Sequence, residues 1–293
     1  MNTDSTPRSV SSILKSSAQR LRIVSASPRL DAELLLQQIL GWQRHELITR
    51  EWEEVSGEAV RAFEELLARR LSCEPMAYIR GMKEFWGLQF EVGPGVLIPR
   101  PETELLVELS LQRVLCSEDE VSLLDIGTGS GALAVALAFE LSRRGRSFRI
   151  VAADSSSVAL EWADRNIRRN DLEKYIDLRR SDWFAALRDE QFDLIVSNPP
   201  YIADGDTAIA PGLRFEPKEA LFSGPEGLDA IRFLLTHVSP HLRVNGTFLF
   251  EIGASQRGEV ERVLREEALP FECTFHKDLS GMDRAAECRR RGT

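Results

Sequence analysis

The sequence has few of the residues that build metal centres or cross-linked scaffolds, with four cysteines and four histidines among 293 residues. The cysteines are scattered and no two form a C-x-x-C pair, so the sequence suggests neither a zinc site nor a disulfide framework. We therefore expect Cys73, Cys116, Cys273 and Cys288 to be reduced thiols, and we expect no metal in the functional site.

Long apolar runs and an excess of positive charge are also lacking. Residues 1–12 are polar without an apolar signal core, and no later segment has the roughly 18 uninterrupted apolar residues that a membrane span needs. The formal net charge of -9 argues against a broad surface for nucleic-acid phosphates, although a local basic patch is compatible with it. We expect a cytoplasmic monomer that binds neither membranes nor nucleic acid directly.

The first eighty residues carry two patterns that predict helices. Ser27 and Pro28 precede a leucine-rich run that ends at Gly41, which provides an N-cap, a proline at the first helical position and a glycine stop. The second pattern begins at Ser56. Its apolar residues recur at helical spacing: Val60, Phe63, Leu66, Leu67 and Leu71. We predict a small all-helical domain over residues 1–80.

The rest of the sequence has the pattern of an α/β domain. Residues 81–101 are rich in glycine, proline, aromatic and β-branched residues, which predicts a β-hairpin linker. Over residues 102–293, apolar runs alternate with helical patterns, which predicts a Rossmann-like parallel sheet covered by helices. The predicted strands cover residues 122–125, 148–154, 176–180, 192–197 and 246–252. The strand predicted at 271–276 and the one from 283 leave no room for a crossover helix, so the last strand should be antiparallel.

A motif suited to hold a planar amino group follows the apolar run at residues 192–196. It consists of Asn198, Pro199, Pro200 and Tyr201. Asn198 offers a side-chain carbonyl, and because two successive prolines carry no backbone N–H, the carbonyl of Pro199 can also face a ligand. Two acceptors can grip two N–H bonds and aim the nitrogen lone pair, while Tyr201 adds a ring for stacking. The motif therefore predicts methylation at nitrogen; the alternative is a strand that ends in a proline-rich turn.

A glycine-rich turn after a buried strand predicts the cofactor site. Its residues are Gly127, Thr128, Gly129, Ser130 and Gly131, and they begin two positions after Asp125. This spacing differs from the G-x-G-x-x-G of dinucleotide enzymes. Asp154 ends the next strand and can accept from ribose hydroxyls, while Asp182 and Trp183 follow the third strand and can bind an adenine amino group and ring.

Each of these residues also has a structural explanation: a plain strand-to-helix turn, a helix cap at Asp154, or a core position for Trp183. Taken together, however, they lie at the ends of successive strands, where open α/β sheets bind ligands. The layout is that of an S-adenosylmethionine-dependent methyltransferase, with Asn198 adjoining both cofactor and acceptor.

Adenine N6, cytosine N4 and the glutamine side chain all present the same planar NH2, so the Asn198 motif does not choose among them. Residues 98–103 together with Phe85 and Trp86 are far more selective. The segments that carry a family resemblance are residues 27–36, 74–81, 84–87, 97–104, 215–221, 250–253 and 279–284. Through these segments the sequence resembles the peptide chain release factor N5-glutamine methyltransferases, the HemK/PrmC family, over nearly its whole length. Residues 210–214 depart from the acidic stretch expected there, and residues 285–288 are less β-branched than the closing strand of the family.

The resemblance implies methyl transfer to the glutamine of the Gly-Gly-Gln loop in class 1 release factors, with S-adenosylhomocysteine as the product. It implies that residues 127–131, Asp154 and Trp183 contact the cofactor, that residues 198–201 contact the glutamine, and that residues 1–80 dock the factor. Residues 100–103 would lie near the cleft or simply begin a helix.

Three alternatives remain at this point. A DNA or RNA amino methyltransferase, for instance one that acts on adenine N6, should carry a basic groove or an added recognition domain, and the acidic sequence shows neither plainly. A nicotinamide oxidoreductase would need another glycine spacing and would leave residues 198–201 without a role. A noncatalytic binding protein would have no need for the complete set of site residues.

Overall fold

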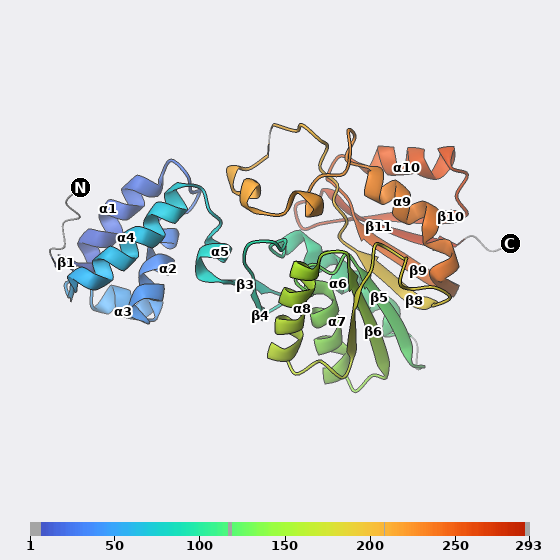
Figure 1. Cartoon of the computed structure of the whole chain (residues 1–293), viewed down its shortest axis with the longest axis horizontal. Helices are drawn as coiled ribbons and strands as arrows, with labels where there is room; N and C mark the ends of the chain where they lie inside the picture. The colour runs from blue at the N-terminus through green and yellow to red at the C-terminus, as the bar shows by residue number, and fades with distance from the viewer. Residues whose placement is uncertain (1–6, 117–118, 208, 291–293) are drawn as a thin grey trace. The chain divides into compact units, whose positions relative to one another are not determined.

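The computed structural model describes residues 7–116, 119–207 and 209–290. The chain forms two compact units, and Figure 1 shows their elements. The first unit contains Met1–Gly81 together with Ala210–Phe215, and the second contains Met82–Ile209 and Glu216–Thr293. The chain thus returns to the first unit for six residues in the middle of the second. Within the described ranges, no helix is long and apolar enough to cross a membrane.

The first unit is a helical bundle. Its helices are α1 (Val10–Leu21), α2 (Pro28–Leu40), α3 (Arg44–Thr49), α4 (Gly57–Leu71) and α5 (Met76–Arg80). The short strands β1 (Arg8–Ser9) and β2 (Glu54–Val55) pair antiparallel. Gly41 ends α2 in the left-handed conformation, with φ of 69°, and the Ser56 side chain accepts from the N–H of Ala59 at the start of α4. Ser27 occupies the predicted N-cap position but makes no side-chain cap bond.

Apolar side chains from α1, α2 and α4 fill the core of this unit, among them Ile13, Leu35 and Phe63. An ion pair of 2.8 Å between Arg70 of α4 and Asp31 of α2 ties the two helices together. The returning segment contains the 3-10 turn η2 (Pro211–Phe215), and Arg214 donates to the carbonyl of Ser72 just after α4.

The second unit contains, in the described part of the chain, a seven-stranded sheet of order β10-β11-β9-β8-β5-β6-β7. The strands are β5 (Val121–Ile126), β6 (Phe148–Asp154), β7 (Ile176–Arg180), β8 (Phe192–Ser197), β9 (Leu242–Glu251), β10 (Phe271–Lys277) and β11 (Asp283–Arg290). β11 runs antiparallel to both β9 and β10, and the pairs among β5 to β9 are parallel. The predicted α/β sheet with its antiparallel last strand is confirmed, and β9 begins four residues earlier than predicted.

Helices cover the sheet: α6 (Glu104–Val114), α7 (Ala132–Arg143), α8 (Ser157–Arg169), α9 (Asp229–His237) and α10 (Arg257–Glu266) (Figure 1). Alternate strand residues such as Leu124, Ile126 and Phe248 join α9 and α10 in one apolar core. Because side chains alternate along a strand, the intervening residues point to the other face. Among the described residues, the connections of this unit also contain the 3-10 turns η1 (Pro101–Thr103), η3 (Lys218–Ala220) and η4 (Ser239–His241).

A tight hairpin precedes the sheet in sequence. β3 (Met82–Phe85) and β4 (Leu88–Glu91) pair antiparallel, and Trp86 and Gly87 form the turn with φ of 55° and 72°. Two positive φ values in a two-residue loop match the right-handed twist of the flanking strands. The Trp86 N–H donates to Glu104 at 2.8 Å, and its indole N–H donates to Glu140 at 3.1 Å. These bonds fasten the turn to α6 and α7.

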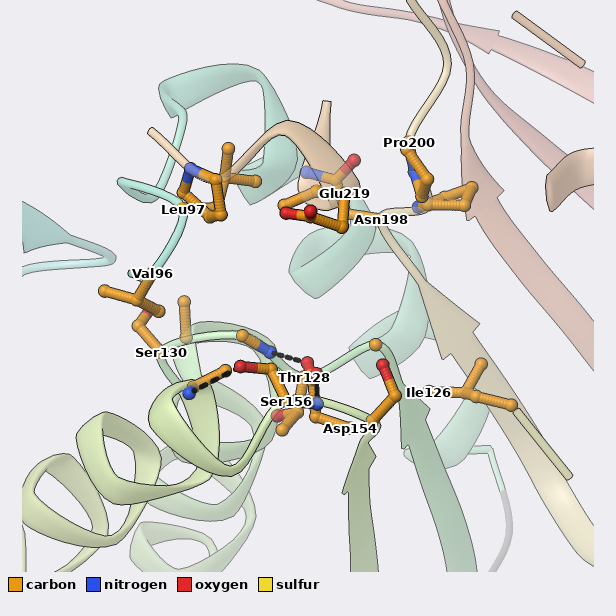
Figure 2. Close-up of a pocket in the computed structure, with 18 of the residues that line it drawn as sticks. Val96, Leu97, Ile126, Thr128, Ser130, Asp154, Ser156, Asn198, Pro200 and Glu219 are labelled. Atoms are coloured by element: carbon orange, nitrogen blue, oxygen red, sulfur yellow. Dashed lines mark hydrogen bonds between the residues drawn. The ribbon is translucent and has the colours of Figure 1, made fainter. Parts of the chain in front are cut away.

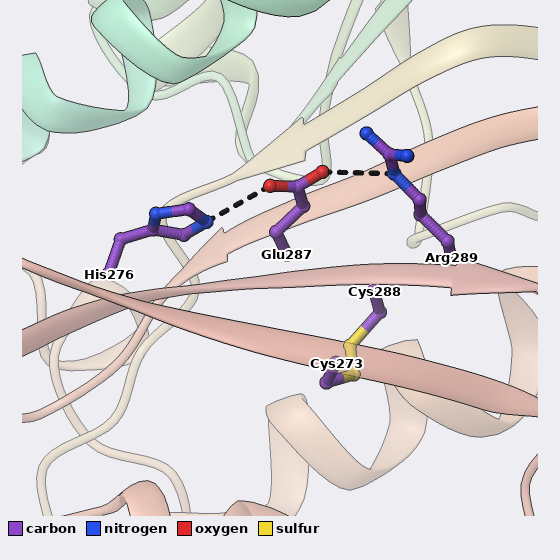
Figure 3. Close-up of a disulfide and its surroundings, with 5 residues drawn as sticks. All are labelled: Cys273, His276, Glu287, Cys288 and Arg289. Carbon is purple, nitrogen blue, oxygen red and sulfur yellow. Dashed lines mark hydrogen bonds and ion pairs between the residues drawn. A yellow bond between two sulfur atoms is a disulfide. The ribbon is translucent and has the colours of Figure 1, made fainter.

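One prediction about cysteine is wrong. Cys273 and Cys288 form a disulfide across β10 and β11 (Figure 3), whereas Cys73 and Cys116 are free thiols. The two linked residues lie directly opposite each other in the antiparallel register, with their Cα atoms 4.2 Å apart. A separation of 15 residues in sequence gave no sign of this proximity, because strand register is not evident from cysteine spacing.

Candidate active site

A cavity of about 460 Å³ lies in the second unit at the carboxyl ends of β5, β6, β7 and β8. Figure 2 shows Asn198 and Pro200 on one side of it and Thr128 and Asp154 on the other. Residues that follow four neighbouring strands therefore meet around one space, as expected for a ligand site in an open α/β sheet.

The glycine turn after β5 leaves room for a ligand at two of its three glycines. Gly127, Gly129 and Gly131 have φ of 76°, 56° and 81°, a region that side chains disfavour. No described heavy atom lies within 4 Å of a Cβ built on Gly127 or Gly129. A Cβ on Gly131 would lie 3.3 Å from Cβ of Ala163, so this glycine permits close packing on α8 instead of lining the cavity.

Asp125 lies beneath the glycine turn rather than in the cavity wall. Its Oδ2 accepts from the Thr128 hydroxyl at 2.6 Å and from the N–H of Ala134 at 3.1 Å. Its Oδ1 is buried and has no hydrogen-bond partner among the described residues. Burial raises the pKa of Asp125 to about 7. The residue thus holds the turn in shape, while Thr128 and Ser130 line the cavity themselves.

Asp154 ends β6 and lines the cavity. Its two oxygens accept from the N–H of Gly129 and the N–H of Ser156, each at 2.9 Å. Burial raises the pKa of this carboxyl above its usual range, against the effect of the N–H donors. Ser156, not Asp154, is the N-cap of α8, since its side chain accepts from Ala159 at 3.2 Å. Asp154 therefore joins the glycine turn to the next strand at the cavity wall.

Asp182 and Trp183 follow β7, and both line the cavity. Asp182 is exposed, so its carboxylate is available to a ligand. The backbone of Trp183 has φ of 47°, and its half-buried ring lies 5.8 Å from the ring of Phe233. Trp183 therefore packs against the core and also lines the cavity. The sequence left these two roles, core residue and ligand contact, as alternatives.

The predicted amino-group motif follows β8. Asn198, Pro199 and Pro200 line the cavity, and the Asn198 side-chain NH2 donates to the hydroxyl of Thr103 at 3.0 Å. Tyr201 is placed differently from the prediction. Its hydroxyl donates to Glu251 at 3.0 Å, its ring packs against the core, and burial raises its pKa. The structure thus places three residues of the motif in the cavity wall and the fourth behind it.

Of residues 100–103, Thr103 lines the cavity. Arg100 pairs with the buried carboxylate of Glu216 at 2.7 Å, and Glu216 also accepts from the N–H of Ile98 at 3.0 Å. Glu102 is exposed. These bonds fix the segment that carries Leu97 and Pro99 into the wall.

Sequence reasoning missed the role of Glu251, which is 1% exposed at the end of β9. An acid directly after the apolar residues Phe248, Leu249 and Phe250 was the available signal, since buried carboxylates need partners.

The residues around the cavity fit S-adenosylmethionine. The space over Gly127 and Gly129 admits a ligand against the backbone, and Asp154 and Asp182 provide acceptors for hydroxyl and amino groups. Apolar residues such as Val96, Ile126 and Leu133 complete the wall.

Comparison with known proteins agrees with this geometry. Two family models match: the PrmC N-terminal domain over residues 12–81 and the methyltransferase small domain over residues 102–225. The release factor glutamine methyltransferase of Coxiella burnetii is 37% identical over 282 residues, which cover 96% of this chain and 99% of the relative. That of Pseudomonas aeruginosa is 43% identical over 263 residues, which cover 89% and 92%.

The chain belongs to the release factor glutamine methyltransferase family. The resemblance inferred from residues 27–36, 97–104 and the other segments is therefore confirmed. Among solved structures, a methyltransferase from Pyrococcus furiosus matches with a TM-score of 0.52 at 21% identity and covers 78% of this chain and 100% of its own. That match shows a shared fold and says nothing about which group this protein methylates.

Proposed function

We propose that this protein transfers a methyl group from S-adenosylmethionine to the side-chain amide nitrogen of the glutamine in the Gly-Gly-Gln loop of class 1 peptide chain release factors. It would act in the cytoplasm as a monomer and release S-adenosylhomocysteine and one proton, which leaves the methylated nitrogen. Family membership supports the choice of acceptor. The observation that carries the proposal is the placement of Asn198 across a single cavity from the glycine turn and Asp154.

The two sides of the cavity would divide the work. The backbone of residues 127–130, Asp154, Asp182 and Trp183 would hold the cofactor, which supplies a methyl group on a positively charged sulfur. Asn198 Oδ1 and the Pro199 carbonyl would accept from the two N–H bonds of the glutamine amide. This grip would fix the NH2 so that the nitrogen lone pair, which is perpendicular to the amide plane, faces the methyl group, and it would stabilise positive charge that develops on nitrogen.

Such a grip is needed because an amide nitrogen is a poor nucleophile. Its lone pair is delocalised, and the resonance that resists twisting is worth roughly 18–20 kcal/mol. Pro199 and Pro200 have no backbone N–H, so neither can compete with the substrate for the carbonyl of Pro199. Apolar walls at Leu97, Pro199 and Pro200 would exclude water from the acceptor nitrogen.

We further propose that residues 1–80 dock the release factor, that 81–101 link the domains, and that 102–293 carry out the transfer. This division explains how a cavity suited to one side chain could select one protein. A protein substrate is also compatible with the acidic net charge of the sequence, whereas a nucleic-acid substrate would require a basic groove.

The test uses labelled S-adenosylmethionine with a release factor, beside a copy whose loop glutamine is changed to alanine. We expect label on the first and none on the second. Asn198→Ala should reduce methyl transfer by about 100-fold, the usual scale for one lost donor or acceptor at a reacting centre, and leave cofactor affinity by calorimetry within a few fold. Equal loss of both would place Asn198 in the cofactor site, and label on DNA or RNA would overturn the acceptor.

A further inference from the structure

A chain of hydrogen bonds links a buried carboxylate to the amide of Asn198. Thr103 donates its hydroxyl proton to Glu251 Oε2 at 2.6 Å, and the Thr103 oxygen accepts from Asn198 Nδ2 at 3.0 Å. Thr103 is 4% exposed and Glu251 is 1% exposed, so the bond between them is buried, whereas the bond from Asn198 to Thr103 lies at the cavity wall. Tyr201 occupies the other oxygen of Glu251 at 3.0 Å.

The number of protons available along these hydrogen bonds determines the orientation of the Asn198 amide. The Asn198 amide could point either its NH2 or its oxygen toward Thr103, because both ends can bond to a hydroxyl. The hydroxyl has a single proton. An ionised Glu251 takes that proton, since a carboxylate only accepts. Thr103 must then accept from Asn198, which directs Nδ2 inward and leaves Oδ1 on the other arm of the amide.

We propose that Glu251 is a positioning residue for methyl transfer: through Thr103 it fixes the Asn198 amide in the orientation that presents Oδ1 to the acceptor nitrogen. The inference rests on the proposed function, in which Oδ1 grips an N–H of the substrate. With the amide reversed, an NH2 would face the NH2 of the glutamine, and two donors would meet. Glu251 therefore matters for the reaction although it lies outside the cavity wall.

The groups around Glu251 come from three segments: η1, the residues after β8, and β11. Thr103 and Tyr201 donate to it, Arg284 of β11 stabilises its negative charge, and Glu102 opposes that charge. Burial raises the pKa of Glu251 nonetheless. When the carboxyl takes up a proton, it can donate to Thr103, which can then donate to Asn198 Oδ1 and favour the reversed amide. Activity should accordingly fall as pH falls through the pKa of Glu251.

The test compares four variants under saturating and limiting release factor. Thr103→Val removes the hydroxyl but keeps the shape, Thr103→Ser restores the hydroxyl, and Glu251→Gln replaces the carboxylate with a group that cannot ionise. Tyr201→Phe is the matched control, because it removes the other hydrogen bond to the same carboxylate without touching the Thr103 link.

We expect Thr103→Val to lower kcat by roughly tenfold or more, the effect of one buried hydrogen bond, with cofactor affinity unchanged and with rescue by Thr103→Ser. Tyr201→Phe should cost clearly less. Glu251→Gln should lower kcat and remove the decline at low pH. The proposal fails if Thr103→Val and Tyr201→Phe lose kcat equally, if Thr103→Val weakens cofactor binding as much as it lowers kcat, or if Glu251→Gln keeps the pH profile of the unmodified protein.

A binding measurement without cofactor adds a readout that does not depend on turnover. The affinity of a release factor and of its Gln→Ala copy is measured for the unmodified protein and for Thr103→Val. The difference between factor and copy should shrink in Thr103→Val, whereas a merely structural change would weaken both alike. If the unmodified protein labels a nucleobase instead, the proposed function fails, and the same comparison of Thr103 variants then decides the positioning role with that amino group.

Discussion

Two carboxylates, the buried Asp125 and the half-buried Asp154, support the same glycine turn in different ways. Asp125 binds Thr128 from beneath, and Asp154 binds the N–H of Gly129 from the wall. Burial raises the pKa of both. At the residue scale, burial of these carboxyl groups lowers the stability of the fold, since ionised groups are costly where water is excluded. Their hydrogen bonds in return hold the glycine turn in one conformation.

Asp125→Asn should reduce the dependence of stability on pH. Because the pKa of Asp125 is about 7 in the folded state and roughly 3.9 in an unfolded chain, the folded state binds its proton more tightly, and stability falls as pH rises between these values. At about 1.4 kcal/mol per pH unit, the loss is roughly 4 kcal/mol at most. Asparagine cannot ionise, so denaturant unfolding at pH 5, 6, 7 and 8 should give a flatter profile. An unchanged slope would mean that other groups control it.

Asp154→Ala should weaken cofactor binding. A hydrogen bond to a charged group is worth roughly 1.5–3 kcal/mol, which corresponds to a loss in affinity of about 10- to 100-fold. In this variant the N–H groups of Gly129 and Ser156 lose their acceptor. Part of the loss in cofactor affinity would therefore come from a less ordered glycine turn. Calorimetry with S-adenosylhomocysteine measures it, with Asn198→Ala as the control that should bind nearly normally. Normal affinity in Asp154→Ala would contradict a ligand role for this carboxylate.

At the element scale, the strands of the sheet and the helices α2 and α4 followed from local patterns, whereas helices such as α1 and α3 were not predicted. Apolar runs, the glycine turn and the short connection between β10 and β11 were sufficient to predict a parallel sheet with an antiparallel last strand. Relations across the sheet were not predictable in this way. Thr103 and Glu251 are 148 residues apart in sequence, and Cys273 faces Cys288 only because of the β10–β11 register. Asp125, Gly131 and Tyr201 show the same limit, since a motif does not reveal which of its side chains face the cavity.

Reduction of the Cys273–Cys288 bond should destabilise the β10–β11 edge of the sheet. The bond closes a loop with a sequence separation of 15, for which the chain-entropy estimate is about 3 kcal/mol. Thermal unfolding with and without a phosphine reductant tests this, and a Cys273→Ala/Cys288→Ala variant should not respond to the reductant. Alkylation of the denatured, unreduced protein should modify two thiols, Cys73 and Cys116. Modification of all four would show that the bond is absent in solution.

At the scale of the whole molecule, two units share one chain, and the first unit includes a segment from within the second. Ala210–Phe215 lies between the Asn198 motif and Glu216 in sequence, yet it packs with the helices through Arg214 and Ser72. Large apolar side chains on α3 and just after it are exposed, Ile48 at 66% and Trp52 at 78%. Exposed aromatic residues of this kind are frequent anchors in protein interfaces.

If the helical unit docks the release factor, its surface should affect KM and not kcat. Ile48→Ser with Trp52→Ser should raise KM for the intact factor by roughly 10-fold, the cost of about 1.4 kcal/mol at an interface. Methylation of a short Gly-Gly-Gln peptide should not change, because the peptide reaches only the cavity. Initial rates with both substrates measure this. Val244→Ser is the matched control, since Val244 is 91% exposed on the other unit. A parallel rise in KM for the peptide, or none for the factor, would locate docking elsewhere.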